Sequence, residues 1–387
     1  MTPRCLVLNA GSSSLKFGLY EEDGTCQLRG VIGDLPSAPV FRARAAGVDW
    51  PQQALPGETG HESAVAWLLD RLHERGIRFD AVGHRVVHGG MRYAEPARVD
   101  AAVLAELEAL ASLAPLHQGH NLAGIREIAA RHPDLPQIAC FDTAFHRGNA
   151  DLVQRYALPD ALHRAGIRRY GFHGLSYQHL AAVLPTLDAR AAAGRTIALH
   201  LGHGASLCAL RGGASVASSM GFSALDGVPM ATRCGQIDPG VILHLLRGGM
   251  DADAVEDLLY QRSGLLGVSG FSGDMRVLLA SADAAARTAV DLFVLRIVRE
   301  VGALAAMLGG LDALVFTGGI GEHAAPVRAA IVDTLGWLGA RLDADANARH
   351  ATRIAARDSA IGAYIVPADE EGVIAQAALR LACGRAL

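Results

Sequence analysis

The sequence predicts an α/β protein made of two domains with similar topology. Its 387 residues exceed what one hydrophobic core usually fills. A repeated pattern of strand, Gly/Ser turn, strand, turn and strand occupies residues 5–32 and again residues 196–219. Each copy is followed by helical segments that alternate with apolar strands, which is typical of α/β folds. Two unrelated α/β domains that both open with hairpins are the alternative.

In the first half, apolar residues predict strands that are separated by polar turns. These strands are expected at 5–8, 15–20, 26–32, 81–88 and 137–141. Two helices are expected, one over 63–74 that stops at Gly76 and one over 100–113 that starts on Asp100 and ends before a proline.

The second half repeats this order. Its strands are expected at 196–201, 207–210, 215–219, 314–316 and 363–366. Its helices are expected at 251–260, at 282–308, from about Pro326 onward, and at 371–382. We therefore expect residues 1–147 to form one domain, joined by the terminal helix 371–387, and residues 148–370 to form the other.

Composition narrows the class of protein. A net charge of -4 and a pI near 6.5 provide no basic field for nucleic acid. The six cysteines contain no Cys-x-x-Cys pair, which fits a reducing compartment better than a disulfide framework or a zinc site. No run of about 18 apolar residues is present, and the apolar start is short for a signal peptide. We expect a soluble cytoplasmic protein without a membrane partner.

The distribution of positive charge singles out one residue. Of the 35 lysines and arginines, Lys16 is the only lysine. It follows the turn 10–14, whose glycine and serines allow backbone N–H groups and hydroxyls to approach an anion. Lysine is a mobile point charge whereas arginine is a rigid fork, so a moving phosphoryl group is one reason to keep a lysine here. An exposed lysine on a polar hairpin is the alternative.

Two charged residues are associated with apolar strands, Arg85 inside one and Asp142 just past the end of another. Arg85, flanked by His84, can grip a carboxylate or phosphate with both arms of its guanidinium, or form a buried structural ion pair. Asp142 follows an apolar strand, where open α/β sheets place ligand groups. It can hold Mg²⁺, orient a nucleophile, take a proton or cap the following turn.

Later motifs add further candidates. His173 stands between glycines in a turn, and Arg233 lies in a loop bounded by Gly and Pro, suited to reaching a ligand. The run 317–321 places glycines at a strand end ahead of a helix, as nucleotide sites do. The acidic residues 369–371 form a metal site or a favourably charged helix start.

Together these motifs resemble the acetate kinase family, within the superfamily of acetate and sugar kinases, Hsc70 and actin. The resemblance extends from Val7 to Glu371 and is carried most specifically by residues 7–16 and 82–89. It implies two duplicated ribonuclease-H-like (actin-like ATPase) domains flanking a nucleotide cleft. It also implies reversible phosphoryl transfer from ATP to acetate, giving acetyl phosphate and ADP, with Mg²⁺ (Mn²⁺ being the alternative) and in a homodimer. The first domain would serve the acyl and phosphate side and the second the nucleotide.

Matching motif positions carries the family's roles over to this chain. The catalytic groups would be Lys16, Arg85, Asp142, His173 and Arg233. The substrate would be bound by Arg85, Val87, Leu116, His117 and Phe172. The metal would be bound by Asn9 and Glu370. The phosphates and nucleotide would be bound by Ser12, Ser14, Lys16, His200, Leu201, Gly202, His203, Gly204, Asp274, Met275, Arg276, Gly319, Ile320, Gly321, Glu322 and His323.

The chain departs from the family pattern at four positions. His203, His323 and Asp369 stand where the family usually has Asn, and Ala224 stands where a pocket proline is expected. Because one methylene discriminates by only about 1–3 kcal/mol, acetate and propionate both remain candidate substrates. A sugar kinase and a nucleotide-dependent chaperone or actin-like module are the alternatives from other classes. The first would need a polar sugar pocket, and the second would hydrolyse ATP without forming an acyl phosphate.

Overall fold

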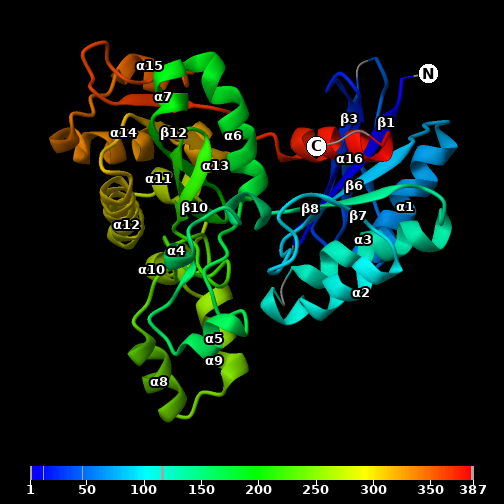
Figure 1. Ribbon diagram of the computed structural model, residues 1–387, viewed down its shortest axis with the longest axis horizontal. Helices are drawn as coiled ribbons and strands as arrows, with labels where there is room; N and C mark the ends of the chain where they lie inside the picture. The colour runs from blue at the N-terminus through cyan, green and yellow to red at the C-terminus, as the bar shows by residue number, and fades with distance from the viewer. Residues whose placement is uncertain (1, 12, 46, 115–116, 385–387) are drawn as a thin grey trace. The chain divides into compact units, whose positions relative to one another are not determined.

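The computed structural model describes residues 2–11, 13–45, 47–114 and 117–384 (Figure 1). Within those residues the chain divides into two compact units. The first unit contains residues 1–147 and 369–387, and the second contains residues 148–368. Residues 369 and 370, which the sequence placed at the end of the second domain, belong to the first unit because they begin its last helix.

The first unit is organised around one mixed sheet. In its described residues the strand order is β5-β4-β3-β2-β1-β6-β8-β7. The strands are β1 (Arg4–Ala10), β2 (Leu15–Glu21), β3 (Cys26–Gly33), β4 (Val40–Ala45), β5 (Gln53–Ala54), β6 (Ala81–Val86), β7 (Ala97–Arg98) and β8 (Gln137–Phe141). β1 runs antiparallel to β2 but parallel to β6, and β6 runs parallel to β8. The carboxyl ends of β1, β6 and β8 therefore lie at one edge of the sheet.

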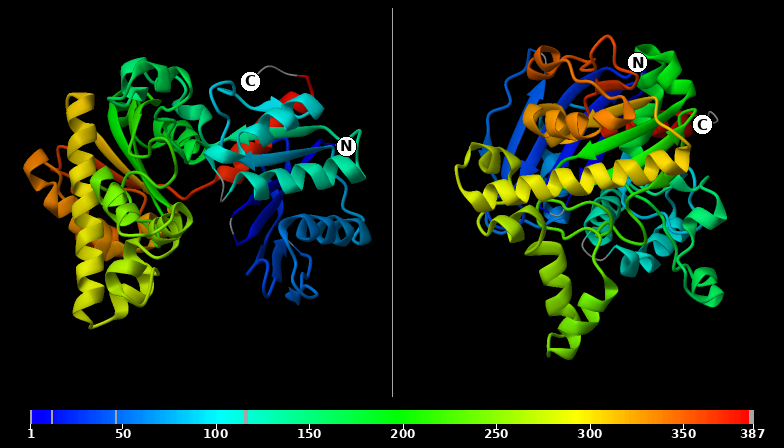
Figure 2. Two further views of the ribbon diagram at one scale, coloured as in Figure 1. Left: turned by 90° about the horizontal axis from the view of Figure 1, so that it is seen from below. Right: turned by 90° about the vertical axis from the view of Figure 1, so that its left-hand side faces the viewer.

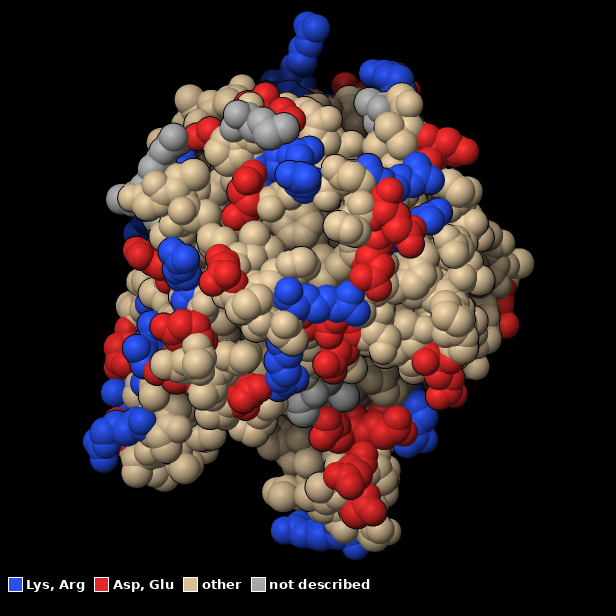
Figure 3. Space-filling view, turned by 90° about the vertical axis from the view of Figure 1, so that its right-hand side faces the viewer, with Lys and Arg blue, Asp and Glu red and all other residues tan. Residues whose placement is uncertain are grey.

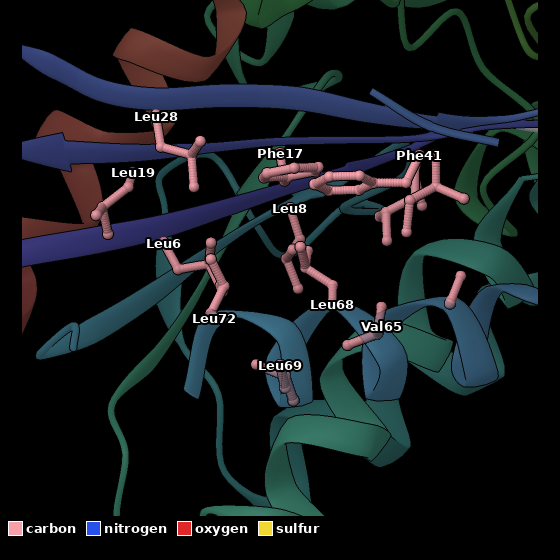
Figure 4. Packing of buried hydrophobic residues seen from close by; sticks show 14 of the residues in the cluster. Leu6, Leu8, Phe17, Leu19, Leu28, Phe41, Val65, Leu68, Leu69 and Leu72 are labelled. Atoms are coloured by element: carbon pink, nitrogen blue, oxygen red, sulfur yellow. The ribbon is translucent and has the colours of Figure 1, made fainter. Parts of the chain in front are cut away.

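Helices cover this sheet on both faces. They are α1 (His61–Glu74), α2 (Ala101–Ala109), α3 (Gln118–Arg131) and α16 (Glu370–Ala382), with short 3₁₀ turns η1 (Ala111–Leu113) and η2 (Ala144–His146). Leu68 and Leu72 of α1 point toward strand residues such as Leu6 and Phe17 (Figure 4). Each such leucine, fully buried, contributes roughly 1.5–3 kcal/mol. α16 approaches β6 closely because Gly83 has no side chain; a Cβ there would lie 2.6 Å from Ile374 Cγ2.

The second unit repeats the strand order of the first. Its described sheet reads β11-β10-β9-β12-β13. The strands are β9 (Arg195–Leu201), β10 (Ala205–Arg211), β11 (Ala214–Ser218), β12 (Ala313–Thr317) and β13 (Gly362–Ile365). In both units a three-stranded antiparallel meander is extended, beyond its first strand, by two parallel strands. The predicted duplication of an α/β domain is confirmed by this shared order.

Helices surround the second sheet, and the long α12 packs against β9 and β10 (Figure 2). The helices are α4 (Asp151–Gln154), α5 (Asp160–Arg164), α6 (Gly174–Leu187), α7 (Ala189–Ala193), α8 (Pro239–Arg247), α9 (Ala252–Gln261), α10 (Gly264–Ser269), α11 (Met275–Ala280), α12 (Ala284–Leu308), α13 (Gly318–His323), α14 (Ala325–Thr334), α15 (Ala344–Ala348) and the 3₁₀ turn η3 (Gly336–Leu338). α8 and α9 extend away from the sheet of their unit (Figure 1). Among the described residues, no helix is long and apolar enough to cross a membrane.

Some boundaries differ from those expected. The helix expected over 100–113 ends at Ala109 and tightens into η1, since a proline follows soon after. β6 ends at Val86 rather than at His88, because the next amides bond to side chains: Val87 N donates to Asn121 Oδ1. The glycine run after β12 forms a short helix, α13, ahead of the expected one.

Candidate active site

The turn between β1 and β2 places Asn9 next to Lys16. The two residues are opposite one another in the antiparallel register, so their side chains lie on the same face of the sheet. Asn9 is buried whereas Lys16 is exposed. The Gly11 amide donates to the Ser14 carbonyl at 2.8 Å and closes the turn. Ser12, expected to bind phosphate, lies outside the described residues.

Arg85 and Asp142 form a paired contact at the carboxyl ends of β6 and β8. Arg85 Nε donates to Asp142 Oδ1 at 3.0 Å and Nη2 donates to Oδ2 at 2.6 Å. A third donor, Nη1, reaches Asn9 Oδ1 at 3.3 Å. Burial raises the pKa of Asp142, opposed by the Arg85 guanidinium and reinforced by Glu370. Burial alone would lower the pKa of Arg85, but Asp142 and Glu370 more than offset it, and Arg85 stays protonated.

The three acidic residues at the start of α16 have different partners. Asp369 caps the helix by accepting from Gly372 N at 3.3 Å, and it pairs with Arg29 at 3.3 Å. Glu371 Oε1 accepts from Asn9 Nδ2 at 2.9 Å. Glu370, the residue matched to the metal ligand, acts electrostatically on Arg85 and Asp142. In the part of the chain that is described, no cluster of three His, Cys, Asp or Glu side chains is arranged to hold a metal.

The residues expected to bind the acyl group occur in both units. In the first unit, Val87 is 3% exposed and His117 immediately precedes α3. Leu116 lies outside the described residues. In the second unit, Phe172 is buried at the start of α6. Two of the three described residues, Val87 and Phe172, are therefore buried and apolar, and the third is His117.

His173 is held in an unusual backbone conformation at the start of α6. Its φ of 56° is left-handed, a region that non-glycine residues enter rarely and that clusters at functional sites. Its Nδ1 lies 2.8 Å from Ser206 Oγ of β10, and its ring stacks on His200 of β9 with centroids 4.2 Å apart. Strand β9, strand β10 and the left-handed turn together fix the direction of the imidazole.

Gly204 marks the point where His173 and Arg233 converge. A Cβ built on Gly204 would lie 3.3 Å from His173 Nε2 and 3.7 Å from Arg233 Nη1. The Arg233 guanidinium is positioned by the Ala224 carbonyl, which accepts from Nη1 at 3.1 Å. Its loop is tied to the β9–β10 turn by the Ala231 amide, which donates to the His203 carbonyl at 3.1 Å. The glycine turn of the second hairpin is therefore flanked by two hydrogen-donating side chains from other segments, His173 and Arg233.

The glycine run after β12 adjoins the same hairpin. Gly318 has a φ of 76°, and a Cβ on it would lie 2.8 Å from the Leu201 carbonyl. A Cβ on Gly202 would be 3.9 Å from Gly319 N. Glycine is needed at 318 both for its left-handed conformation and for this close approach. The expected nucleotide segments 200–204 and 319–323 thus meet within the second unit.

The remaining residues expected to bind the nucleotide mostly form hydrogen bonds with backbone amides of their own helices. Glu322 Oε1 accepts from Gly318 N and from Ala368 N, each at 3.0 Å. Asp274 caps α11 by accepting from Arg276 N at 2.9 Å. Hydrogen bonds from the Arg276 side chain hold the pKa of Asp274 below its ordinary value. Arg276 itself is largely exposed.

Residues 4–376 match the model of the acetokinase family. The chain belongs to the acetokinase family. It is 50% identical to an acetate kinase of Rhodopseudomonas palustris over 400 aligned positions, which cover 99% of this chain and 100% of the relative. It is 48% identical to an acetate kinase of Rhizobium meliloti, with 97% and 98% of the two chains covered.

Two solved structures of the family have the same fold as this acetokinase family member. One is a propionate kinase from Francisella tularensis, 33% identical, with a TM-score of 0.91 and 98% and 99% of the two chains covered. The other is an acetate kinase of Porphyromonas gingivalis, 34% identical, with a TM-score of 0.87 and 98% and 99% covered. The expected duplicated ribonuclease-H-like fold of the actin-like ATPases is thereby confirmed.

Three departures from the family pattern can be placed in the structure. Ala224 positions Arg233 through its backbone carbonyl, which any residue supplies, so the loss of proline keeps this contact. His203 likewise contributes a backbone carbonyl to the Arg233 loop. His323 is exposed at the end of α13, with its ring 6.1 Å from that of His350.

The structure adds positioning residues that the sequence did not single out. Ser206 contacts His173, and Asn121 joins Val87 N to the Ala10 carbonyl at 3.0 and 2.8 Å. Glu371, which the family match did not select, accepts a hydrogen bond from Asn9 Nδ2 at 2.9 Å. The roles of Ser206 and Asn121 could not be predicted from the sequence, because their partners are distant in the chain.

Proposed function

We propose that this protein transfers the γ-phosphoryl group of ATP to acetate, reversibly and by direct in-line attack, giving acetyl phosphate and ADP. Membership of the acetokinase family supports the reaction class. The observation that carries the proposal is the convergence of His173 Nε2 and Arg233 Nη1 beside Gly204. A cation and an imidazole directed at a bare backbone turn suit a phosphoryl group whose charge is spread over several oxygens.

Charge stabilisation and positioning dominate this mechanism. The acetate carboxylate is already a nucleophile, so no base has to remove a proton from it. From the first unit we assign Lys16 and Arg85 to the phosphoryl and carboxylate oxygens. Asp142 holds Arg85 in its paired geometry at 2.6 and 3.0 Å. From the second unit, Arg233 and His173 stabilise the charge on the transferring group.

Hydrogen bonding orders the tautomer of His173. We assign the Ser206 hydroxyl as donor to Nδ1, with the Tyr177 hydroxyl as donor to Ser206 in turn. This assignment places the ring proton on Nε2, the atom that lies 3.3 Å from a Cβ built on Gly204, and we assign that N–H to a phosphoryl oxygen during transfer. A neutral imidazole can then donate without having to be protonated.

We assign the metal to the oxygen donors of Asn9 and Glu370, with Glu371 beside Asn9. Carboxylate and amide oxygens suit Mg²⁺, with Mn²⁺ as the alternative, and Mg²⁺ usually takes only one or two protein carboxylates together with substrate phosphates. The metal would neutralise phosphate charge. The nucleotide is assigned to the segments 200–204, 274–276 and 319–323 of the second unit.

The acyl substrate is assigned as acetate, with propionate as the alternative because one similar solved structure is a propionate kinase. Val87, Leu116, His117 and Phe172 would line the acyl pocket. A hydroxamate assay tests the function: the protein, ATP, Mg²⁺ and hydroxylamine are mixed with acetate, propionate or butyrate. We expect acetyl hydroxamate, with kcat/KM falling as the acid lengthens. ATP consumption without hydroxamate for any acid would refute the proposal.

We infer a homodimer in the cytoplasm. In the described chain, none of the α8 side chains is buried, although Val241, Leu243 and Leu246 are apolar. Such an apolar helix surface supports burial against a second copy. All six cysteines lie within the described residues and are present as thiols, which fits a reducing compartment. Positive and negative side chains alternate on the face shown in Figure 3, so we assign no nucleic-acid partner.

A further inference from the structure

The described carbonyl groups of the β1–β2 turn each have a hydrogen-bond partner within the first unit. In the described part of this turn, Ala10 O accepts from Asn121 Nδ2 at 2.8 Å, and Ser14 O accepts from Gly11 N at 2.8 Å. Ser13 O accepts from Leu35 N at 3.0 Å. Gly11 O lies 2.7 Å from His61 Nε2. Because these described carbonyl oxygens are engaged, they do not oppose the binding of an anion by the N–H and hydroxyl groups of the turn.

Two of these described carbonyls are contacted by side chains. Asn121 contacts that of Ala10, and His61 contacts that of Gly11. His61 is the first residue of α1 and is 7% exposed. α1 is fixed by its buried residues Val65, Leu68 and Leu72, so the imidazole has little freedom to withdraw. Because a carbonyl oxygen can only accept, His61 must be the tautomer that carries its proton on Nε2.

His120 of α3 holds the His61 ring from the side. The two rings are stacked, with centroids 4.2 Å apart and an angle of 28° between their planes. Burial lowers the pKa of His61 and the neighbouring His120 lowers it further, and together they outweigh the backbone groups of Gly11 and Ser14, which raise it. Both features favour a neutral ring whose single N–H is committed to the turn. Asn121, the next residue of α3, donates to Ala10 O. The start of α3 therefore supports two adjacent carbonyls, that of Ala10 directly and that of Gly11 through His61.

We propose that His61 is a positioning residue for phosphoryl transfer, acting through the Gly11 carbonyl and held in place by His120. The proposal rests on the proposed function of the turn in binding phosphate. If the Nε2–H donor of His61 is lost, the Gly11 carbonyl oxygen can rotate toward the bound anion. It then repels the anion, because the oxygen carries a partial negative charge. The turn then presents a misdirected dipole to the phosphoryl group, and displacements of about 1 Å can reduce rates 100-fold.

The test compares His61→Leu, which removes the donor, with His61→Gln, whose amide can donate from nearly the position of Nε2. We expect kcat to fall at least tenfold in His61→Leu, with KM for acetate within twofold of wild type. We expect His61→Gln to recover to within about threefold of wild type. His73→Leu is the matched control, because His73 is exposed on the same helix, and we expect wild-type kinetics from it.

A second readout does not depend on activity. Amide hydrogen exchange in a peptide covering residues 9–17 should be faster in His61→Leu than in wild type, and unchanged in His73→Leu. A folded His61→Leu with wild-type kcat and wild-type exchange would overturn the inference. Equal losses in His61→Leu and His61→Gln would also overturn it, because ring packing rather than the donor would then matter. An inactive wild type with exchange changed only in His61→Leu would refute the proposed function and leave the role of His61 in the turn standing.

Discussion

The Arg85–Asp142 pair offers a quantitative test through the substitution Asp142→Asn. Asparagine keeps the size of the side chain but removes its charge, and its amide group faces one arm of the guanidinium where an oxygen stood. Asp142 has a side chain that is 2% exposed and that of Arg85 is 15% exposed, so water cannot readily replace the lost partner. The variant leaves a buried positive charge without its closest counter-charge.

The expected magnitude follows from the geometry of the contact. Two hydrogen bonds of 2.6 and 3.0 Å join the pair. Removing one member of a buried ion pair typically costs about 3–5 kcal/mol. With a slope of roughly 2 kcal/mol per molar urea, the unfolding midpoint of the first unit should fall by about 1.5–2.5 M. kcat should fall as well, because Arg85 loses its fixed orientation.

Tryptophan fluorescence can follow this unit separately. Trp50 and Trp67 pack in the core of the first unit, whereas Trp337, in the second unit, is 73% exposed. Trp337→Phe is therefore a suitable background for urea unfolding. The double variant Arg85→Met with Asp142→Leu should be destabilised by less than the sum of the single changes. A shift below 0.5 M in Asp142→Asn would refute the reasoning.

Four further substitutions test other parts of the account. Lys16→Arg should lower kcat, because a rigid fork replaces a mobile point charge, and wild-type turnover would make Lys16 a compositional leftover. Arg233→Ala should lower kcat far more than it raises KM for ATP, and unchanged kcat would exclude its assigned role. Arg328→Met should destabilise the second unit by about 3–5 kcal/mol and raise KM for ATP more than KM for acetate. The reason is that the fully buried Arg328 donates to the carbonyls of Gly321 and Glu322 at 2.9 Å, and an unchanged KM for ATP would contradict it. Asp312→Asn tests pH dependence: hydrogen bonds from Arg195 lower the folded pKa of Asp312, so its stabilisation is present above the unfolded pKa of about 3.9 and is lost as pH falls. The difference in Tm between wild type and this variant should thus be larger at pH 7 than at pH 3, and a constant difference would contradict the assignment.

Prediction from the sequence succeeded best where a turn of small residues was flanked by apolar strand patterns. The two Gly/Ser hairpins could be predicted because apolar runs flank small residues at 5–32 and 196–219, and both form the first strands of their sheets. Lys16 could be singled out by composition alone. The boundary error at 100–113 has a local cause, since the tightening of the last turn into a 3₁₀ turn leaves the apolar pattern intact.

Contacts between distant segments could not be predicted. Asn9 and Glu371, whose side chains are joined by a hydrogen bond, are 362 positions apart. Ser206 beside His173 and His61 beside Gly11 have partners on separate elements, and no spacing rule connects them. β4, β5, β7 and α3 also escaped prediction, because their short or mixed patterns gain their burial only from neighbours in the folded unit.

Phosphoryl transfer to acetate is the central claim, and the stoichiometry of the products tests it most directly. The protein is incubated with ATP labelled in its γ-phosphate and Mg²⁺, with and without acetate, and ADP, acetyl phosphate and inorganic phosphate are separated. The account predicts that ADP forms only with acetate and that label enters acetyl phosphate one-to-one with ADP. Label released as inorganic phosphate at the same rate with and without acetate would contradict it.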